Sequence, residues 1–349
     1  MVPKIDQSFI KEKSIFYIDG EIKGEEGNRH MCNQMFVEAY FPIEKKHPYP
    51  VVMMHGAGQT NVNWLMTPDG RMGWSDYFVS QGYEVYLCEQ PSRGRSAYHP
   101  DENGPRRFHP VHVLQNNFMS DNANWPQSRL HTQWPGSGNM EFEDEIDRQF
   151  LASQVEYLPK NRDSQILMLN SGKKLLEKIG PSILLTHSQA GPFGWLLADA
   201  VPELVKGIIA LEPSGPPFSR DPEAKIAENF GIADLPLHLD PPVGSLSELQ
   251  IEKNITDDSA LWDGLAFQDP APKLPRLKGI PIWLIVSEAS YHSQFDHLTS
   301  HVLDQCGVEH SFIRLEDVGI RGNGHMMMYE KNNLEIADYL IGLLKEKSL

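Results

Sequence analysis

Short apolar runs alternate along the chain with stretches that have a helical, amphipathic period. The apolar runs are rich in branched residues, as is typical of strands buried on both faces of a sheet, and they lie at residues 49–54, 84–88, 182–185, 205–211, 280–286 and 311–315. Helices are predicted at residues 73–81, 195–200, 293–306 and 333–345. Strands that alternate with helices predict an α/β fold, with a mostly parallel, doubly wound sheet and helices on both faces.

The N-terminal residues follow a different pattern, and two long stretches interrupt the alternation of strands and helices. Residues near 14–23 and 35–43 alternate between apolar and polar side chains, which predicts an antiparallel hairpin. Residues 97–140 and 215–279 lose this periodicity, and residues 141–179 predict two helical stretches. We therefore expect one catalytic domain over residues 1–349, with insertions at 97–165 and 215–279.

The insertions are candidates for a cap over the active site. Irregular stretches of this length inside a compact domain are usually functional or disordered. The first insertion contains the aromatic residues Phe108, Phe118, Trp125 and Trp134, which favour an ordered cap.

Composition and charge exclude several classes of protein. The chain is 40% apolar and 22% charged, and its formal net charge of −16 argues against binding to a nucleic-acid backbone. No apolar run approaches the length of a membrane span. The three cysteines, Cys32, Cys88 and Cys306, predict no disulfide framework. Residues 1–6 hold no apolar signal core, so we expect a cytoplasmic protein, with a secreted or periplasmic location after removal of a signal peptide as the alternative.

Ser188 is the candidate nucleophile. The apolar run at 182–185 ends in polar residues, and the small residues Ala190 and Gly191 follow Ser188 before a predicted helix. This order predicts a strand, a sharp turn and a helix, which is the arrangement that exposes a serine hydroxyl above a sheet. Thr186 departs from the pattern, because glycine is usual two places before the serine.

A glycine-containing loop at residues 55–60 follows the first buried strand. Gly56 and Gly58 allow backbone N–H groups to turn toward a ligand, which in an acyl-transfer enzyme supplies half of an oxyanion hole. Their spacing does not match a nucleotide-binding fingerprint.

A serine nucleophile needs an imidazole to accept its proton and a carboxylate to orient that imidazole. His325 lies in a glycine-rich loop between the last strand and the final helix, so it is the candidate base. Two carboxylates can serve. Glu212 follows directly on the predicted strand at 205–211, the first strand after the sharp turn at Ser188. Glu288 follows the strand at 280–286, which is the commoner position for the acid of such a triad. We favour Glu212, and the remaining alternative is that both are ordinary surface carboxylates.

The chain resembles a bacterial esterase group of the α/β-hydrolase superfamily whose triad is Ser–His–Glu. The resemblance covers about residues 50–345 and rests on the segments 55–60, 67–74, 93–96, 187–191, 211–213 and 322–328. It implies the α/β-hydrolase fold, a triad of Ser188, His325 and Glu212, and oxyanion donors in the backbone N–H groups of Ala57 and Gln189. Such esterases can carry adjacent cysteines in the oxyanion loop, where this chain has Ala57 and Gly58. Fungal lactonases are a more distant likeness.

These residues predict a serine hydrolase that cleaves carboxylic esters or lactones through an acyl-enzyme. The alternatives are an acyltransferase or amidase on the same triad, and a receptor of the same fold that binds ligand with little turnover. We expect a small-molecule substrate, no cofactor, no metal, no nucleic acid and no membrane partner, and we consider a homodimer as the assembly. The candidate substrate-binding residues are Gly58, Trp125, Trp134 and Met326.

Overall fold

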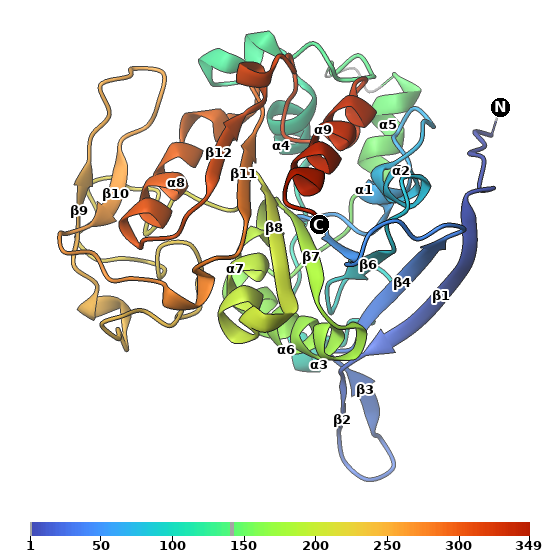
Figure 1. The fold of residues 1–349 in the computed structure, drawn as a ribbon, viewed down its shortest axis with the longest axis horizontal. Coiled ribbons are helices and arrows are strands. Elements are labelled where there is room, and N and C mark those ends of the chain that lie inside the picture. The colour runs from blue at the N-terminus through green and yellow to red at the C-terminus, as the bar shows by residue number, and fades with distance from the viewer. Residues whose placement is uncertain (1, 140–142) are drawn as a thin grey trace.

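The computed structural model describes residues 2–139 and 143–349. Its centre is an eight-stranded sheet with the strand order β1-β4-β6-β5-β7-β8-β11-β12 (Figure 1). The strands of this sheet are β1 (Ile10–Ile18), β4 (Met35–Pro42), β5 (Val51–Met54), β6 (Val85–Glu89), β7 (Ser182–His187), β8 (Val205–Leu211), β11 (Ile282–Val286) and β12 (Ser311–Arg314).

The sheet is mostly parallel, as the sequence predicted. The pairs β1–β4 and β4–β6 are antiparallel, and every other neighbouring pair in this sheet is parallel. Met54 of β5 is level with Thr186 of β7, and His187 is level with Leu211 of β8. The loops that follow these three central strands therefore begin at the same edge of the sheet, where ligands of such sheets bind.

Helices fill the connections between the strands. They are α1 (Val62–Leu65), α2 (Trp74–Ser80), α3 (Pro100–Asn103), α4 (Val111–Leu114), α5 (Glu145–Ala152), α6 (Asn161–Ile179), α7 (Gly191–Ala200), α8 (Asp296–Gln305) and α9 (Asn333–Glu346). Short helical turns are η1 (Gln115–Met119), η2 (Pro126–Leu130), η3 (Ser188–Ala190), η4 (Pro202–Leu204), η5 (Leu246–Glu248), η6 (Pro275–Leu277), η7 (Tyr291–Gln294) and η8 (Leu315–Val318). None of the helices in the described part of the chain is both long and apolar enough to cross a membrane.

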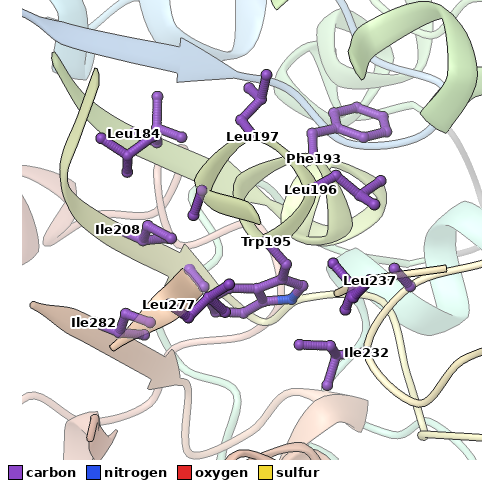
Figure 2. Close-up of a cluster of buried hydrophobic side chains, with 14 of the residues drawn as sticks. Leu184, Phe193, Trp195, Leu196, Leu197, Ile208, Ile232, Leu237, Leu277 and Ile282 are labelled. Carbon is purple, nitrogen blue, oxygen red and sulfur yellow. The ribbon is translucent and has the colours of Figure 1, made fainter. Parts of the chain in front are cut away.

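The core lies on both faces of the sheet because successive strand residues point to opposite sides. On β5, Val52 and Met54 join one buried cluster, whereas Val51 and Met53 join the other. The first cluster includes residues of α6 and α7 and centres on Trp195 (Figure 2), and the second includes residues of α2 and α9. Burial on both faces explains why these strands read as continuous apolar runs.

The opening hairpin differs from the prediction. β1 pairs with β4, but it ends at Ile18 instead of continuing to residue 23. Asp19 has a positive φ of 61°, which turns the chain out of the sheet. The next residues form a separate hairpin of β2 (Glu21–Lys23) and β3 (His30–Cys32), which projects from the body of the protein (Figure 1).

The insertions carry little regular structure, as expected. The first contains α3, α4, η1 and η2 before it reaches α5 and the start of α6. The second contains a hairpin of β9 (Ile251–Asn254) and β10 (Gly264–Phe267) together with η5 and η6. The predicted helical region at 141–179 corresponds to α5 and α6, except that residues 140–142 lie outside the described residues.

Gly191, the first residue of α7, meets the loop that follows β8. A Cβ added there would lie 2.2 Å from Cβ of Pro213 and 2.6 Å from its Cα. These atoms belong to a rigid proline and its backbone, so they cannot move aside without shifting the neighbouring Glu212.

We predict that Gly191→Ala lowers the free energy of unfolding by roughly 1–3 kcal/mol, because the methyl group overpacks this contact. Gly342→Ala is the matched control. Gly342 lies within α9 with no atom near its would-be Cβ, so alanine should raise stability by up to about 1 kcal/mol. Urea denaturation of both variants measures this difference, and equal stability of the two would contradict the packing described.

Candidate active site

Ser188 lies at the turn between β7 and α7 with its backbone in the left-handed region, at φ 55°. A non-glycine residue there costs on the order of 1–3 kcal/mol, so the surrounding contacts must hold it. The Ser188 carbonyl accepts a hydrogen bond from the Ser214 N–H at 2.9 Å. Gly56 also approaches closely, since a Cβ there would lie 3.0 Å from Cβ of Ser188. The loop after β5 therefore passes directly beside the serine.

Glu212, at the end of β8, is fully buried and has a positive φ of 44°. Its carboxylate accepts three hydrogen bonds, all from other loops. The Ser287 N–H donates at 2.8 Å, the Ser290 hydroxyl donates at 2.6 Å, and Nδ1 of His325 lies 2.5 Å from Oε2. The structure thus joins Glu212 to the predicted base.

Glu288 makes different contacts. Its carboxylate accepts hydrogen bonds from Nη1 of Arg321 at 2.7 Å and from the Gly322 N–H at 2.8 Å. Among the described residues it forms no hydrogen bond or ion pair with His325. Glu288 therefore supports the loop that carries the histidine and does not compete with Glu212 for the imidazole.

A second buried carboxylate, that of Glu330, holds the same loop from its other end. It accepts hydrogen bonds from the Gly324 N–H at 2.8 Å and from Nδ2 of Asn323 at 2.6 Å. In the first insertion, Nε2 of His131 lies 2.7 Å from Oε1 of the same carboxylate. His325 is thus positioned by a loop that is fixed on both sides.

Burial dominates the electrostatics of the His325–Glu212 pair. Loss of water raises the pKa of Glu212 to about 7, although the charge of His292 and the hydrogen bonds from Ser290 and Ser287 oppose this shift. Loss of water also lowers the pKa of His325 well below its ordinary value. A neutral imidazole that uses its Nδ1–H on a carboxylate leaves Nε2 free to accept a proton.

Aromatic side chains surround the imidazole of His325. The Phe118 ring stacks on it with centroids 5.2 Å apart, and the His292 ring stacks at 4.8 Å. The centroid of the Tyr291 ring lies 5.0 Å from that of His325. Burial raises the pKa of the Tyr291 phenol, and its interaction with the Ser188 side chain partly opposes that rise. Sequence reasoning missed Tyr291 and His292, although their place just after a buried strand was a usable signal.

The described residues contain one group that could hold a metal ion, formed by Glu212, His292 and His325. The hydrogen bonds argue against that use. Both oxygens of Glu212 already accept donors, and Nδ1 of His292 is 2.8 Å from Oδ1 of Asp296. The set therefore fits a hydrogen-bonded network better than a metal centre.

The loop at residues 55–60 is braced by Arg93, which is buried and forms no ion pair within the described chain. Its guanidinium donates to the carbonyls of Gly56 and Gln59 at 3.2 Å each, and to Oε1 of Gln189 at 3.3 Å. Desolvation lowers the pKa of Arg93 to about 9. This one side chain therefore links the two segments that carry the predicted oxyanion donors.

Those donors lie beside the serine. Ala57 and Gln189 both line the cavity that contains Ser188. The N–H of Ala57 has no hydrogen-bond acceptor among residues 2–139 and 143–349. Gln189 lies in η3 at the start of the elbow helix, where backbone N–H groups lack partners within the helix.

The cavity beside Ser188 and His325 has a volume of about 690 Å³ and draws residues from both insertions. Trp125 and Met326 line it, as predicted, and Nε1 of Trp125 donates to the Ala289 carbonyl at 3.0 Å. A larger hollow of about 850 Å³ lies elsewhere, beside residues 62–70 and α5. We base the site on the smaller cavity because it contains the polar groups just described.

Two predicted substrate-binding residues do not line this cavity. Trp134 packs in the core against Phe150 and donates to Asp147 at 2.7 Å, because its indole N–H needs a buried acceptor. Gly58 faces His109, which its would-be Cβ approaches to 3.0 Å, and its carbonyl accepts from the Val155 N–H. Both residues therefore pack against neighbouring parts of the protein and do not face the cavity.

Comparison with known proteins agrees with this architecture. The family model described as "Alpha/beta hydrolase family" matches residues 51–339. The chain is 39% identical over 337 residues to a protein named "Probable secreted lipase phiG" from Fungal sp. (strain ATCC 74256), covering 96% of this chain and 90% of that protein. A solved structure described as that of a novel bacterial esterase aligns with a TM-score of 0.64 at 21% identity, covering 100% of this chain and 99% of the other. The chain belongs to the alpha/beta hydrolase family and has the α/β-hydrolase fold.

Proposed function

We propose that the protein is a serine hydrolase that cleaves carboxylic esters or lactones. One observation carries the proposal, namely the buried contact between Glu212 and His325, a histidine that lines the same cavity as Ser188. The names of the similar proteins, a secreted lipase and a bacterial esterase, support ester hydrolysis in general. Neither name identifies the substrate of this chain.

In the proposed mechanism, Nε2 of His325 accepts the hydroxyl proton of Ser188 while the serine oxygen attacks the substrate carbonyl carbon. The carboxylate of Glu212 keeps the imidazole in the tautomer with hydrogen on Nδ1 and stabilises the imidazolium. The N–H groups of Ala57 and Gln189 hold the negative oxygen of the tetrahedral intermediate.

The intermediate then collapses. His325 returns the proton to the leaving alkoxide, which departs as an alcohol and leaves the acyl group on Ser188. A water molecule gives a proton to Nε2 of His325 and attacks the acyl carbonyl. The second collapse breaks the bond to the Ser188 oxygen, which takes the proton back from His325, and releases the carboxylic acid. A lactone follows the same steps, except that its alcohol and acid remain in one product.

We further propose that the insertions at 97–165 and 215–279 form the cap of this site. Phe118 and Trp125 of the first insertion and Trp262 of the second line the cavity, so they supply apolar walls for the acyl or alcohol group. The name of the fungal relative supports a secreted location. The cytoplasmic location and the homodimer stay predictions from the sequence.

We predict that Ser188→Ala abolishes hydrolysis of a short-chain nitrophenyl ester and labelling by a fluorophosphonate, because no other group replaces its oxygen. Ser92→Ala is the matched control. Ser92 shares the positive φ of Ser188, but its hydroxyl is buried and does not line the cavity, so its loss should spare both activities. Full labelling of Ser188→Ala would contradict the assignment, and a wild-type protein without turnover would favour the receptor alternative.

The two carboxylates give a second prediction. Glu212→Gln should lower kcat by at least about 100-fold, because an amide keeps the shape but no longer stabilises the imidazolium or its tautomer. Glu288→Gln should stay within a few-fold of the wild type, because the hydrogen bonds of Glu288 within the described residues go to Arg321 and the Gly322 N–H and not to His325. Steady-state kinetics measures both, with thermal melting to show that each variant is folded. The reverse ranking would move the acid to Glu288.

A further inference from the structure

The cavity beside Ser188 has a charge opposite to that of the whole protein. The chain contains 47 acidic and 31 basic residues. Yet the lining of this cavity includes Arg107 and Arg220 and, among the described residues, not one aspartate or glutamate. In a protein of net charge −16, a cavity whose described lining has arginines and no acid is unlike the average surface.

Arg107 enters the cavity from the first insertion and is held in place there. Its backbone exchanges two hydrogen bonds of 2.8 Å with Tyr157, and its guanidinium lies over the Tyr157 ring at 4.9 Å from the centroid. No carboxylate within the described residues lies within 4 Å of it. The side chain is exposed and contacts Tyr157, and it has no carboxylate partner among the described residues, so its charge is available to an anion.

Arg220 enters from the second insertion. It is exposed and forms no ion pair with any residue in the described ranges, although Glu228 and Asp234 line the adjoining hollow. Burial is the main cause of the lowered pKa of His292, and the charge of Arg220 lowers it further. The charge of Arg220 therefore acts on a residue that stacks on the His325 ring. Arg220 is therefore close to the site and has no internal counterion.

Other groups agree with a positive site. His109 lines the same cavity, and burial, followed by the charges of Arg107 and Arg93, lowers its pKa to about 4. Asn116, Asn117 and Asn124 add amide donors to the lining. The cavity lining thus offers cations and neutral donors, and its described residues include no acid that would repel an anion.

We propose that the substrate is an ester or lactone that carries a second, anionic group, a carboxylate, which Arg107 and Arg220 bind. This inference rests on the proposed function and deepens it. A guanidinium matches a carboxylate through two parallel N–H donors, so it can orient the substrate as well as attract it. A neutral glyceride has no group for these two cations.

The test compares esters that differ only in charge. The acyl-side pair is 4-nitrophenyl hydrogen adipate and 4-nitrophenyl hexanoate, and the alcohol-side pair is 3-acetoxybenzoate and its methyl ester. Each kcat/KM is divided by the rate constant for hydroxide hydrolysis to remove differences in intrinsic reactivity. We expect the wild type to prefer the anionic member of at least one pair by about tenfold or more, and added salt to reduce the preference.

The double variant Arg107→Gln/Arg220→Gln should lose that preference by a similar factor. Arg148→Gln is the control for charge alone, because Arg148 is an exposed residue of α5 outside the cavity, and it should keep the preference. Equal or better use of both neutral esters by the wild type would overturn the proposal, as would a preference that survives the double variant.

A binding experiment separates this proposal from the proposed function. Calorimetry on Ser188→Ala compares monomethyl adipate with dimethyl adipate, so no turnover is required. Tighter binding of the half-ester, lost in the triple variant that also lacks both arginines, would support the anion site even if hydrolysis failed. Equal binding of the two compounds would overturn it even if hydrolysis of neutral esters succeeded.

Discussion

The buried carboxylate of Glu212 is the constraint on which the site depends. A carboxylate removed from water costs several kcal/mol unless donors surround it. Here the donors come from three places, namely the backbone at Ser287, the hydroxyl of Ser290 and the ring of His325. Because one charge needs all of them, the ends of β8 and β11 and the loop after β12 must converge. The strained backbones of Ser188 and Glu212 are held by this convergence and by the register of the central strands.

The first insertion also belongs to this network of contacts around His325. Phe118 stacks on the His325 ring, Trp125 donates to the Ala289 carbonyl, and His131 pairs with Glu330 beneath the histidine loop. Arg93 performs a comparable task for the loop at residues 55–60, where the esterases that the sequence resembles can carry adjacent cysteines. A buried cation that donates to two carbonyls can hold that loop without a covalent bridge, and the three cysteines of this chain are free.

Sequence reasoning worked where chain geometry determines position. Strands buried on both faces read as apolar runs, and the residues just beyond them, Ser188 and Glu212, must lie at one edge of a parallel sheet. The structure brings Glu212 to His325 there, although the catalytic roles of these residues stay a proposal. The sequence did not predict side-chain positions in the insertions, because these stretches lack the hydrophobic periodicity that shows which side chains face the core. Nothing in the sequence distinguished Trp125, which lines the cavity, from Trp134, which packs in the core. No motif marked Arg107 or Arg220, because their importance comes from the cavity that both line, whose described lining contains no acid.

The central claim, that Glu212 holds the imidazole of His325 through Nδ1–H, can be observed directly. Proton NMR detects an imidazole N–H bonded to a buried carboxylate as a resonance far downfield of the backbone amides, and ¹⁵N labelling of histidine identifies it. The account predicts one such proton on Nδ1 of His325, shifted upfield or lost in Glu212→Gln and unchanged in Glu288→Gln. A downfield proton that persists in Glu212→Gln and disappears in Glu288→Gln would contradict it.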